Sequence, residues 1–153
     1  MTRIFHSVTI TVFADETSKD QRKEGLLQLI PFKAKIEEST ATGLEDDTIY
    51  IYKVTLKNTS EHRQLFTHLY ELLDEEDKNL IDEQLETRID DTCHFFLRFL
   101  APQWIHSESL ELTEEGNCYH LKALVAAYPA RKEQAVQTMR DFLQSLRSRK
   151  EDH

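Results

Sequence analysis

The sequence of 153 residues has little of what builds linkers, nucleotide-binding loops or membrane spans. Its three glycines and three prolines are too few for a glycine-rich phosphate loop, a collagen-like repeat or a long flexible linker. No apolar run approaches the roughly 18 residues of a membrane-spanning helix. The N-terminal residues alternate with threonine, unlike the continuous apolar core of a secretion signal. These absences predict a cytoplasmic globular protein.

The two cysteines, Cys93 and Cys118, lack the C-x-x-C spacing of zinc and redox sites. Both fall in predicted strands, where we expect buried free thiols in a reducing compartment. A disulfide between adjacent strands is the alternative.

Signatures of catalysis and metal binding are also missing. The sequence has no G-x-S-x-G turn, no P-loop and no G-x-G-x-x-G motif. His62 and His68 are six residues apart, a spacing that does not place two ligands on one face of a helix. His94 and His120 could face each other across adjacent strands, but Cys93 beside His94 would point to the opposite face. We therefore predict neither an enzyme nor a metal or cofactor site.

Negative charge dominates the composition, with 28 acidic against 19 basic residues and a net charge of −9. Residues 1–128 carry a net charge of −11, whereas residues 129–153 hold six basic and four acidic residues, a net charge of +2. A general polyanion binder is therefore not expected. The asymmetry still allows a local basic surface.

Hydrophobic periodicity divides the chain into strands and helices. Period-two patterns predict strands at 4–13, 48–57, 92–100 and 117–128, a polar edge strand at 33–42, and a strand at 107–112 that forms a hairpin with 117–128. Apolar residues at helical spacing predict helices at 18–30, 58–73, 74–89 and 129–146. The order favours an α+β fold, a mostly antiparallel sheet with helices packed on one face. We expect a single domain of residues 1–153 with a flexible tail, 147–153.

One glycine interrupts a predicted helix. Gly25 lies inside the helix at 18–30, where glycine costs up to about 1 kcal/mol relative to alanine. We therefore expect another part of the chain to pack closely against this position.

Alternation within the strands assigns their polar residues to one face of the sheet. If the apolar residues face the helices, the opposite face carries Thr9, Thr11, Phe13, Lys53, Thr55, His94, Phe96, Arg98, His120 and Lys122. Aromatic rings among cationic and hydroxyl groups are typical of a sheet that binds RNA, although no RNP-type motif is present. The alternatives are an ordinary mixed surface or a face buried against a second subunit.

Several short stretches resemble one known family. The stretch Val125–Glu133 (VAAYPARKE) is similar to a signature of an archaeal RNA-binding family, described as predicted exosome subunits with a double-stranded-RNA-binding-like domain. Val8–Thr17 (VTITVFADET), Arg88–Asp90 followed by Phe96–Phe99, and Ser109–Leu112 resemble further segments of that family, so the likeness spans most of residues 7–146. The family's glycine-rich turn is reduced here to residues 42–49, and residues 100–104 lack its lysine.

This resemblance implies a non-catalytic protein that binds structured RNA, linked to archaeal RNA processing in an exosome- or ribosome-related setting. RNA-processing subunits are then expected partners. We expect Arg98 and Lys122 on the sheet, with Arg131 and Lys132 at the start of the last helix, to contact phosphates, and Phe96 to stack on a base. The competing hypothesis is a protein–protein interaction module, or homodimer, without direct RNA contact.

Overall fold

The structure of the protein is a computed structural model that describes residues 2–151, apart from the side chains of residues 103 and 149–151. Its elements are β1 (Phe5–Ala14), α1 (Lys19–Leu29), β2 (Glu37–Thr42), β3 (Thr48–Leu56), α2 (Thr59–Leu72), α3 (Glu75–Glu83), α4 (Leu85–Arg88), β4 (His94–Leu100), α5 (Ala101–Ser107), β5 (Cys118–Val125) and α6 (Lys132–Glu151). The five strands form one antiparallel sheet in the order β2-β3-β1-β5-β4. The predicted α+β class is confirmed.

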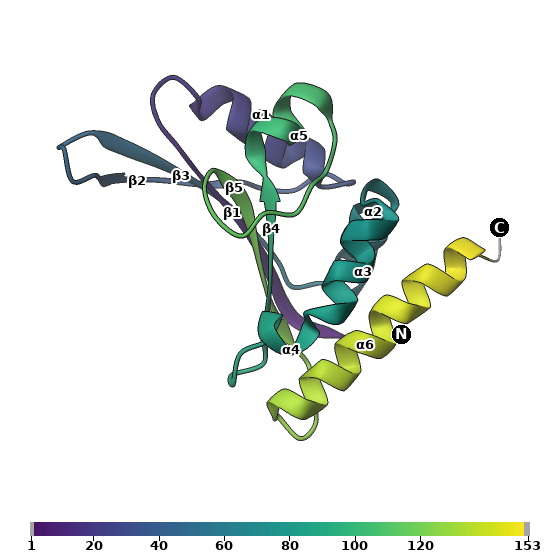
Figure 1. Ribbon diagram of the computed structural model, residues 1–153. Coiled ribbons are helices and arrows are strands. Elements are labelled where there is room, and N and C mark those ends of the chain that lie inside the picture. The colour runs from purple at the N-terminus through teal and green to yellow at the C-terminus, as the bar shows by residue number, and fades with distance from the viewer. Residues whose placement is uncertain (1, 152–153) are drawn as a thin grey trace.

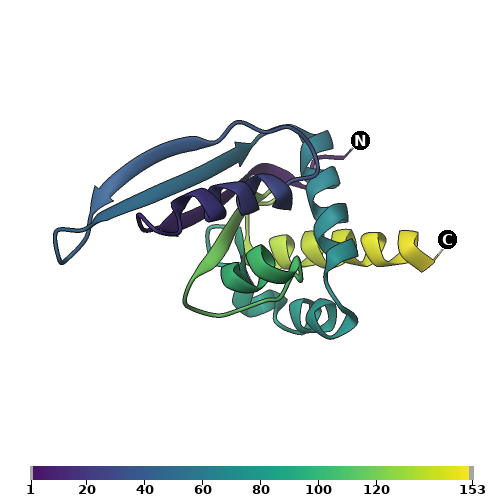
Figure 2. The ribbon, with the colours of Figure 1, turned by 90° about the horizontal axis from the view of Figure 1, so that it is seen from above.

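Helices cover one face of this sheet. Figures 1 and 2 show α1, α2, α3, α5 and α6 on the same side, with the short α4 beside the start of β4. The β2–β3 hairpin projects beyond the rest of the molecule (Figure 1). No helix within residues 2–151 covers the opposite face of the sheet, which we call the open face.

The core lies between the sheet and the helices. Val8, Ile10 and Val12 of β1 are buried and alternate with half-buried threonines, as the period-two pattern predicted. From the helix side, Phe66 of α2 stacks on Phe5 with ring centroids 4.8 Å apart. The alternation of β1 therefore fixes which face of the sheet is open.

The predicted strand at 107–112 is wrong. Residues 101–107 form α5, which ends at Glu108 in a left-handed conformation (φ 53°). Beyond it, the chain runs along the outer edge of β4, where Leu100 N–H donates to the Glu111 carbonyl at 2.8 Å and Leu112 forms a single bridge with Phe99. β5 pairs with β1 and β4, so its two edges are already occupied and no hairpin with 107–112 can form.

The predicted helix at 74–89 is divided. α3 ends before Gln84, whose backbone (φ −102°, ψ 12°) departs from helical geometry, and α4 follows as a single turn. Ile89, assigned to this helix from the sequence, instead bridges to Phe95 of β4. The break brings the end of α4, including Arg88, to the edge of the sheet.

The last helix reaches further than the pattern indicated. α6 continues to Glu151, and residues 152–153 of the expected tail lie outside the described residues. Arg147, the first residue of that tail, donates to Asp82 and Glu75, each at 2.9 Å. These contacts join α6 to α3.

Gly25 lies where the sequence predicted close packing. A Cβ atom at this position would come within 2.1 Å of the Tyr119 hydroxyl, which donates to the Arg22 carbonyl at 3.0 Å. The indole N–H of Trp104 donates to the Gly25 carbonyl itself at 2.9 Å. Gly25 therefore allows α1, α5 and the sheet to meet.

Candidate nucleic-acid interface

The open face differs from the rest of the molecule in charge. The strands β1, β3, β4 and β5 contain no Asp or Glu, although the chain has 28 of these residues. The same four strands carry three basic residues, Lys53, Arg98 and Lys122, and all three side chains are exposed. These four strands of an acidic protein thus carry positive charge without carboxylates of their own, although Glu37 of β2 pairs with Lys53 at one margin.

The strand register brings the predicted residues of β4 and β5 together. Phe96 pairs with Lys122, and Lys122 pairs with Thr9 of β1 on its other side. Arg98 pairs with His120. Paired residues point to the same face with Cβ atoms about 5 Å apart, so Phe96, Arg98 and Lys122 form one cluster.

Aromatic rings lie between these cations. The rings of Phe96 and His120 are stacked, with centroids 5.7 Å apart and planes 12° from parallel. His94 lies on the other side of Phe96 at 6.3 Å, with its plane tilted by 38°. The row His94–Phe96–His120 offers flat surfaces on which unpaired bases could stack.

Burial lowers the pKa of His120 below its usual 6.5, and the positive charges of Arg98 and Lys122 lower it further. The imidazole of His120 is therefore neutral at pH 7. A neutral ring does not repel the two neighbouring cations.

This pKa shift predicts that acid destabilises the fold. The unfolded histidine takes up a proton near pH 6.5, whereas folded His120 resists protonation, and buried His62 has a lowered pKa for the same reason. The free energy of unfolding should therefore fall as the pH drops below 6.5 towards the pKa values that His120 and His62 have in the folded protein. Urea denaturation between about pH 7.5 and about pH 5.5 measures this effect. In His120→Gln the fall should be shallower; an unchanged slope would contradict the assignment.

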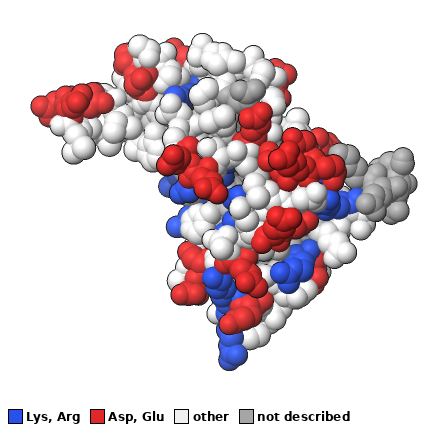
Figure 3. Space-filling model, in the orientation of Figure 1, with Lys and Arg blue, Asp and Glu red and all other residues white. Residues whose placement is uncertain are grey.

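Arg131 and Lys132 lie apart from the cluster. Arg131 is exposed in the connection after β5, and Lys132 opens α6. Residues 126–130 separate them from the end of β5, and Tyr128 in this connection is 73% exposed. In Figure 3, basic side chains appear at the left of the view and at its lower end, with acidic ones between them. The predicted site therefore consists of two basic areas.

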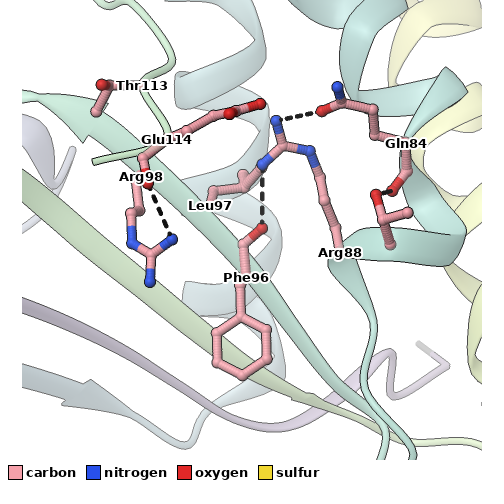
Figure 4. A pocket seen from close by; sticks show the side chains of 8 residues that line it. Gln84, Arg88, Phe96, Leu97, Arg98, Thr113 and Glu114 are labelled. Carbon is pink, nitrogen blue, oxygen red and sulfur yellow. Dashed lines mark hydrogen bonds between the residues drawn. The ribbon is translucent and has the colours of Figure 1, made fainter.

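Arg88 lies beside the cluster, which the residue patterns of the sequence did not indicate. It lines a pocket of about 460 Å³ together with Phe96 and Arg98, at the outer edge of β4 (Figure 4). No periodicity signal predicts this position, because only the break between α3 and α4 brings Arg88 to the sheet.

Two functional classes have no support in the described residues. Residues 2–151 contain no group of three or more His, Cys, Asp or Glu side chains arranged to hold a metal ion. Within that same range, none of the helices has the length and apolar character needed to cross a bilayer. Cys93 and Cys118 are both free.

Comparison with known proteins assigns the chain to a family. A model of the RNA-binding family matches residues 7–125, which include β2, β3, β4, β5 and all but the first two residues of β1. The chain belongs to this family. It is 23% identical over 145 residues to the RNA-binding protein PAB1135 of Pyrococcus abyssi, covering 91% of this chain and 94% of that protein. The predicted membership of an archaeal RNA-binding family is confirmed.

Solved structures of two archaeal DUF54 proteins share the fold. Protein AF2318 from Archaeoglobus fulgidus, described as DUF54, has a TM-score of 0.80 and 25% identity, covering 90% of this chain and 98% of that one. Mth689, a DUF54 protein from Methanothermobacter thermautotrophicus, has a TM-score of 0.73 and 25% identity, covering 92% and 98%. The likeness therefore extends over nearly the whole length of each relative.

Proposed function

We propose that the protein is a non-catalytic RNA-binding protein that holds structured RNA on the open face of its sheet. The observation that carries this proposal is the cluster of Phe96, Arg98 and Lys122, on two strands that contain no Asp or Glu, in a chain with a net charge of −9. Membership of the RNA-binding family supports it independently. The similar protein PAB1135 is named an RNA-binding protein, which also supports the proposal.

The arrangement of the cluster fits single-stranded or looped segments of a structured RNA. Arg98 and Lys122 contact phosphates, while Phe96 and the neutral His120 offer stacking surfaces between them. Stacking of a base on an aromatic side chain contributes about 1–3 kcal/mol. Thr9 and Thr55, whose hydroxyls lie 3.5 Å apart on the same face, offer hydrogen bonds to ribose.

Arg131 and Lys132 supply the second contact. They lie at the N-terminus of the 20-residue helix α6, where unpaired backbone N–H groups add to the positive potential. An RNA that crosses the open face along β5 reaches this area at the end of the strand. We therefore assign phosphate contacts to all four basic residues.

The test is a titration of the wild-type protein with an RNA hairpin that has a single-stranded loop, followed by fluorescence anisotropy at several salt concentrations. Four phosphate contacts predict a plot of log Kd against log salt with a slope of about 3. A slope near zero, or no binding to any RNA at low salt, would contradict the proposal.

A second candidate function is a docking or dimerisation module that makes no RNA contact. It is favoured by Phe13, a residue of the open face that is 54% exposed and pairs with the apolar Ile51. In this case a second copy or another protein covers the sheet. Light scattering and an RNA titration separate the two functions. If the sheet is a dimer interface, Phe96→Asp should lower the molecular mass measured in solution. RNA affinity should then be negligible in the wild type and in the variant.

The cellular role is part of the same proposal. We place the protein in the cytoplasm, where free thiols such as Cys93 and Cys118 stay reduced, and in archaeal RNA processing, in an exosome- or ribosome-related setting. Binding of double-stranded segments and contacts with RNA-processing subunits belong to this role. Identification of the nucleic acids and proteins that co-purify with the native protein tests it.

A further inference from the structure

Arg88 is a half-buried cation with incomplete pairing. Its guanidinium donates to the side-chain oxygen of Gln84 at 2.7 Å and, at 3.5 Å, to the backbone carbonyl of Phe96. Its Nε atom is buried and has no hydrogen-bond partner among residues 2–151. No carboxylate among the described side chains lies within 4 Å of its nitrogen atoms.

Arg147 shows how this protein pairs an arginine elsewhere. Its guanidinium contacts the carboxylates of Glu75 and Asp82, both at 2.9 Å, and the side-chain oxygen of Asn79 at 3.0 Å. Among the described residues, Arg88 has one acceptor at such a distance, the neutral side-chain oxygen of Gln84. Burial lowers the pKa of Arg88, as expected for a cation removed from water without a counter-ion.

The pocket beside Arg88 has the size and polarity to accept an anionic group. It measures about 460 Å³ and is lined by Gln84, Arg88, Phe96, Arg98, Thr113 and Glu114, among others. In Figure 4, Arg88 and Arg98 lie on its two sides, and Phe96 lies below. Among the described side chains, Arg98 donates only to the backbone carbonyl of Glu114, at 3.3 Å, and forms no ion pair.

The pocket opens beside the proposed RNA surface. Phe96 belongs to both: its ring lies in the aromatic row of the open face, and its carbonyl accepts from Arg88. Arg98 likewise belongs to the basic cluster and to the pocket wall. An RNA strand that leaves the open face over the edge of β4 would therefore pass directly by Arg88.

We propose that this pocket binds a phosphate group of an RNA strand, with Arg88 as the main contact and Arg98 at the rim. The inference rests on the proposed RNA-binding function and adds a defined site to it. A phosphate oxygen provides the negative charge that Arg88 lacks, and guanidinium groups match phosphate geometry with paired N–H donors.

Glu114 is the competing anion. Its carboxylate and that of Asp77 favour the charged form of Arg88 from beyond ion-pair distance, and Asp77 is already an acceptor for the Leu112 N–H at 3.3 Å. The exposed loop that carries Glu114 holds it over the pocket (Figure 4). A bound phosphate would have to displace this side chain or share the pocket with it.

The affinity test uses two variants with opposite expected effects. Arg88→Gln should weaken binding of the RNA hairpin about tenfold, the loss of one charged hydrogen-bonding group. Glu114→Gln should strengthen binding about threefold, because it removes a nearby like charge from the path of the phosphate. Glu114 is exposed, so this second variant tests the site even if Arg88→Gln unfolds. Unchanged affinity in folded Arg88→Gln overturns the inference; if Arg88→Gln unfolds, unchanged affinity in Glu114→Gln overturns it.

The source of the phosphate is found by comparing RNA hairpins with a 5′-hydroxyl, a 5′-phosphate or a 3′-phosphate. If Arg88→Gln weakens the affinity for all three hairpins equally, the site binds a phosphodiester within the RNA strand. Dependence confined to one phosphorylated end assigns it to a terminal phosphate. Both results support the site.

A direct readout comes from the Nε–H group of Arg88, which is buried and therefore protected from solvent exchange. In nuclear magnetic resonance spectra its signal should shift on titration with the RNA hairpin. If RNA binds and shifts the signals of Lys122 and His120 but leaves Arg88 unchanged, the pocket is not a phosphate site and the proposed function stands. If no RNA binds the wild-type protein, both proposals fail.

Discussion

Replacing Arg98 and Lys122 together by glutamine is expected to weaken RNA binding about 100-fold. Each charged hydrogen bond to a phosphate contributes about 1.5–3 kcal/mol, which is at least tenfold in affinity for each side chain. Both side chains are exposed, and Arg98 makes a single 3.3 Å contact with the Glu114 carbonyl, so the fold should persist. Fluorescence anisotropy with the RNA hairpin measures the loss, and the salt slope should fall by about 1.5.

The matched control removes the same charge at the opposite edge of the molecule. Lys33 and Lys35 are exposed in the connection between α1 and β2, and β2 is the edge strand furthest from β4. Lys33→Gln/Lys35→Gln changes the net charge equally but should alter affinity less than about threefold, because solvent screens distant charges. Equal losses in both double variants would mean that overall charge, and not the open face, governs binding.

Arg131→Gln/Lys132→Gln provides an internal comparison. These residues are at the end of the proposed path, so their loss should be smaller than that of the Arg98/Lys122 pair. The ranking of the two double variants shows whether the sheet or the start of α6 is the main binding surface.

The largest effect on stability is expected for Gly25→Ala, which should lower the free energy of unfolding by about 2–3 kcal/mol. Alanine improves helix propensity by up to about 1 kcal/mol. The new Cβ would, however, lie 2.1 Å from the Tyr119 hydroxyl and 3.2 Å from Ile105. Over-packing typically costs about 1–3 kcal/mol, and displacement of the Tyr119 hydroxyl from the Arg22 carbonyl costs about 1–3 kcal/mol more.

Urea denaturation of four proteins tests this account of Gly25. Tyr119→Phe removes the hydroxyl that the new Cβ would meet, so Gly25→Ala should cost much less in the Tyr119→Phe background than in the wild type. A stabilising Gly25→Ala, or an equal cost in both backgrounds, would show that close packing against Tyr119 is not the reason for the glycine.

Features that depend on neighbouring residues alone could be predicted from the sequence. The helix predicted at 58–73 agrees with α2, which Asn58 caps: its side-chain oxygen accepts from Ser60 N–H at 2.8 Å and Glu61 N–H at 3.3 Å. The alternation in β1, β4 and β5 predicted the open face, because a strand with one buried side leaves no other choice of face.

Features that depend on which strands pair could not be predicted from the sequence. Residues 107–112 alternate like a strand, but both edges of β5 are taken by β1 and β4. Leu112 therefore reaches the sheet only through one bridge to Phe99. Choosing between these pairings requires the tertiary arrangement, which a local pattern does not contain.

In the candidate site, too, some residues could be predicted from local patterns and others could not. Phe96, Arg98 and Lys122 could be grouped from strand periodicity alone, and the register confirms that they are neighbours. Arg88 could not, because its place depends on the helix break at Gln84 and on the bridge from Ile89 to Phe95. Nothing in the spacing of residues 84–98 indicates that these two arginines line one pocket.

The central claim is that RNA binds the open face of the sheet. Titration of isotope-labelled protein with the RNA hairpin, followed by nuclear magnetic resonance, tests it residue by residue. We predict that the largest shifts occur at Phe96, Arg98, His120 and Lys122, with smaller ones at the start of α6. Shifts concentrated on the exposed side of α2 or α3, with β4 and β5 unchanged, would contradict the account.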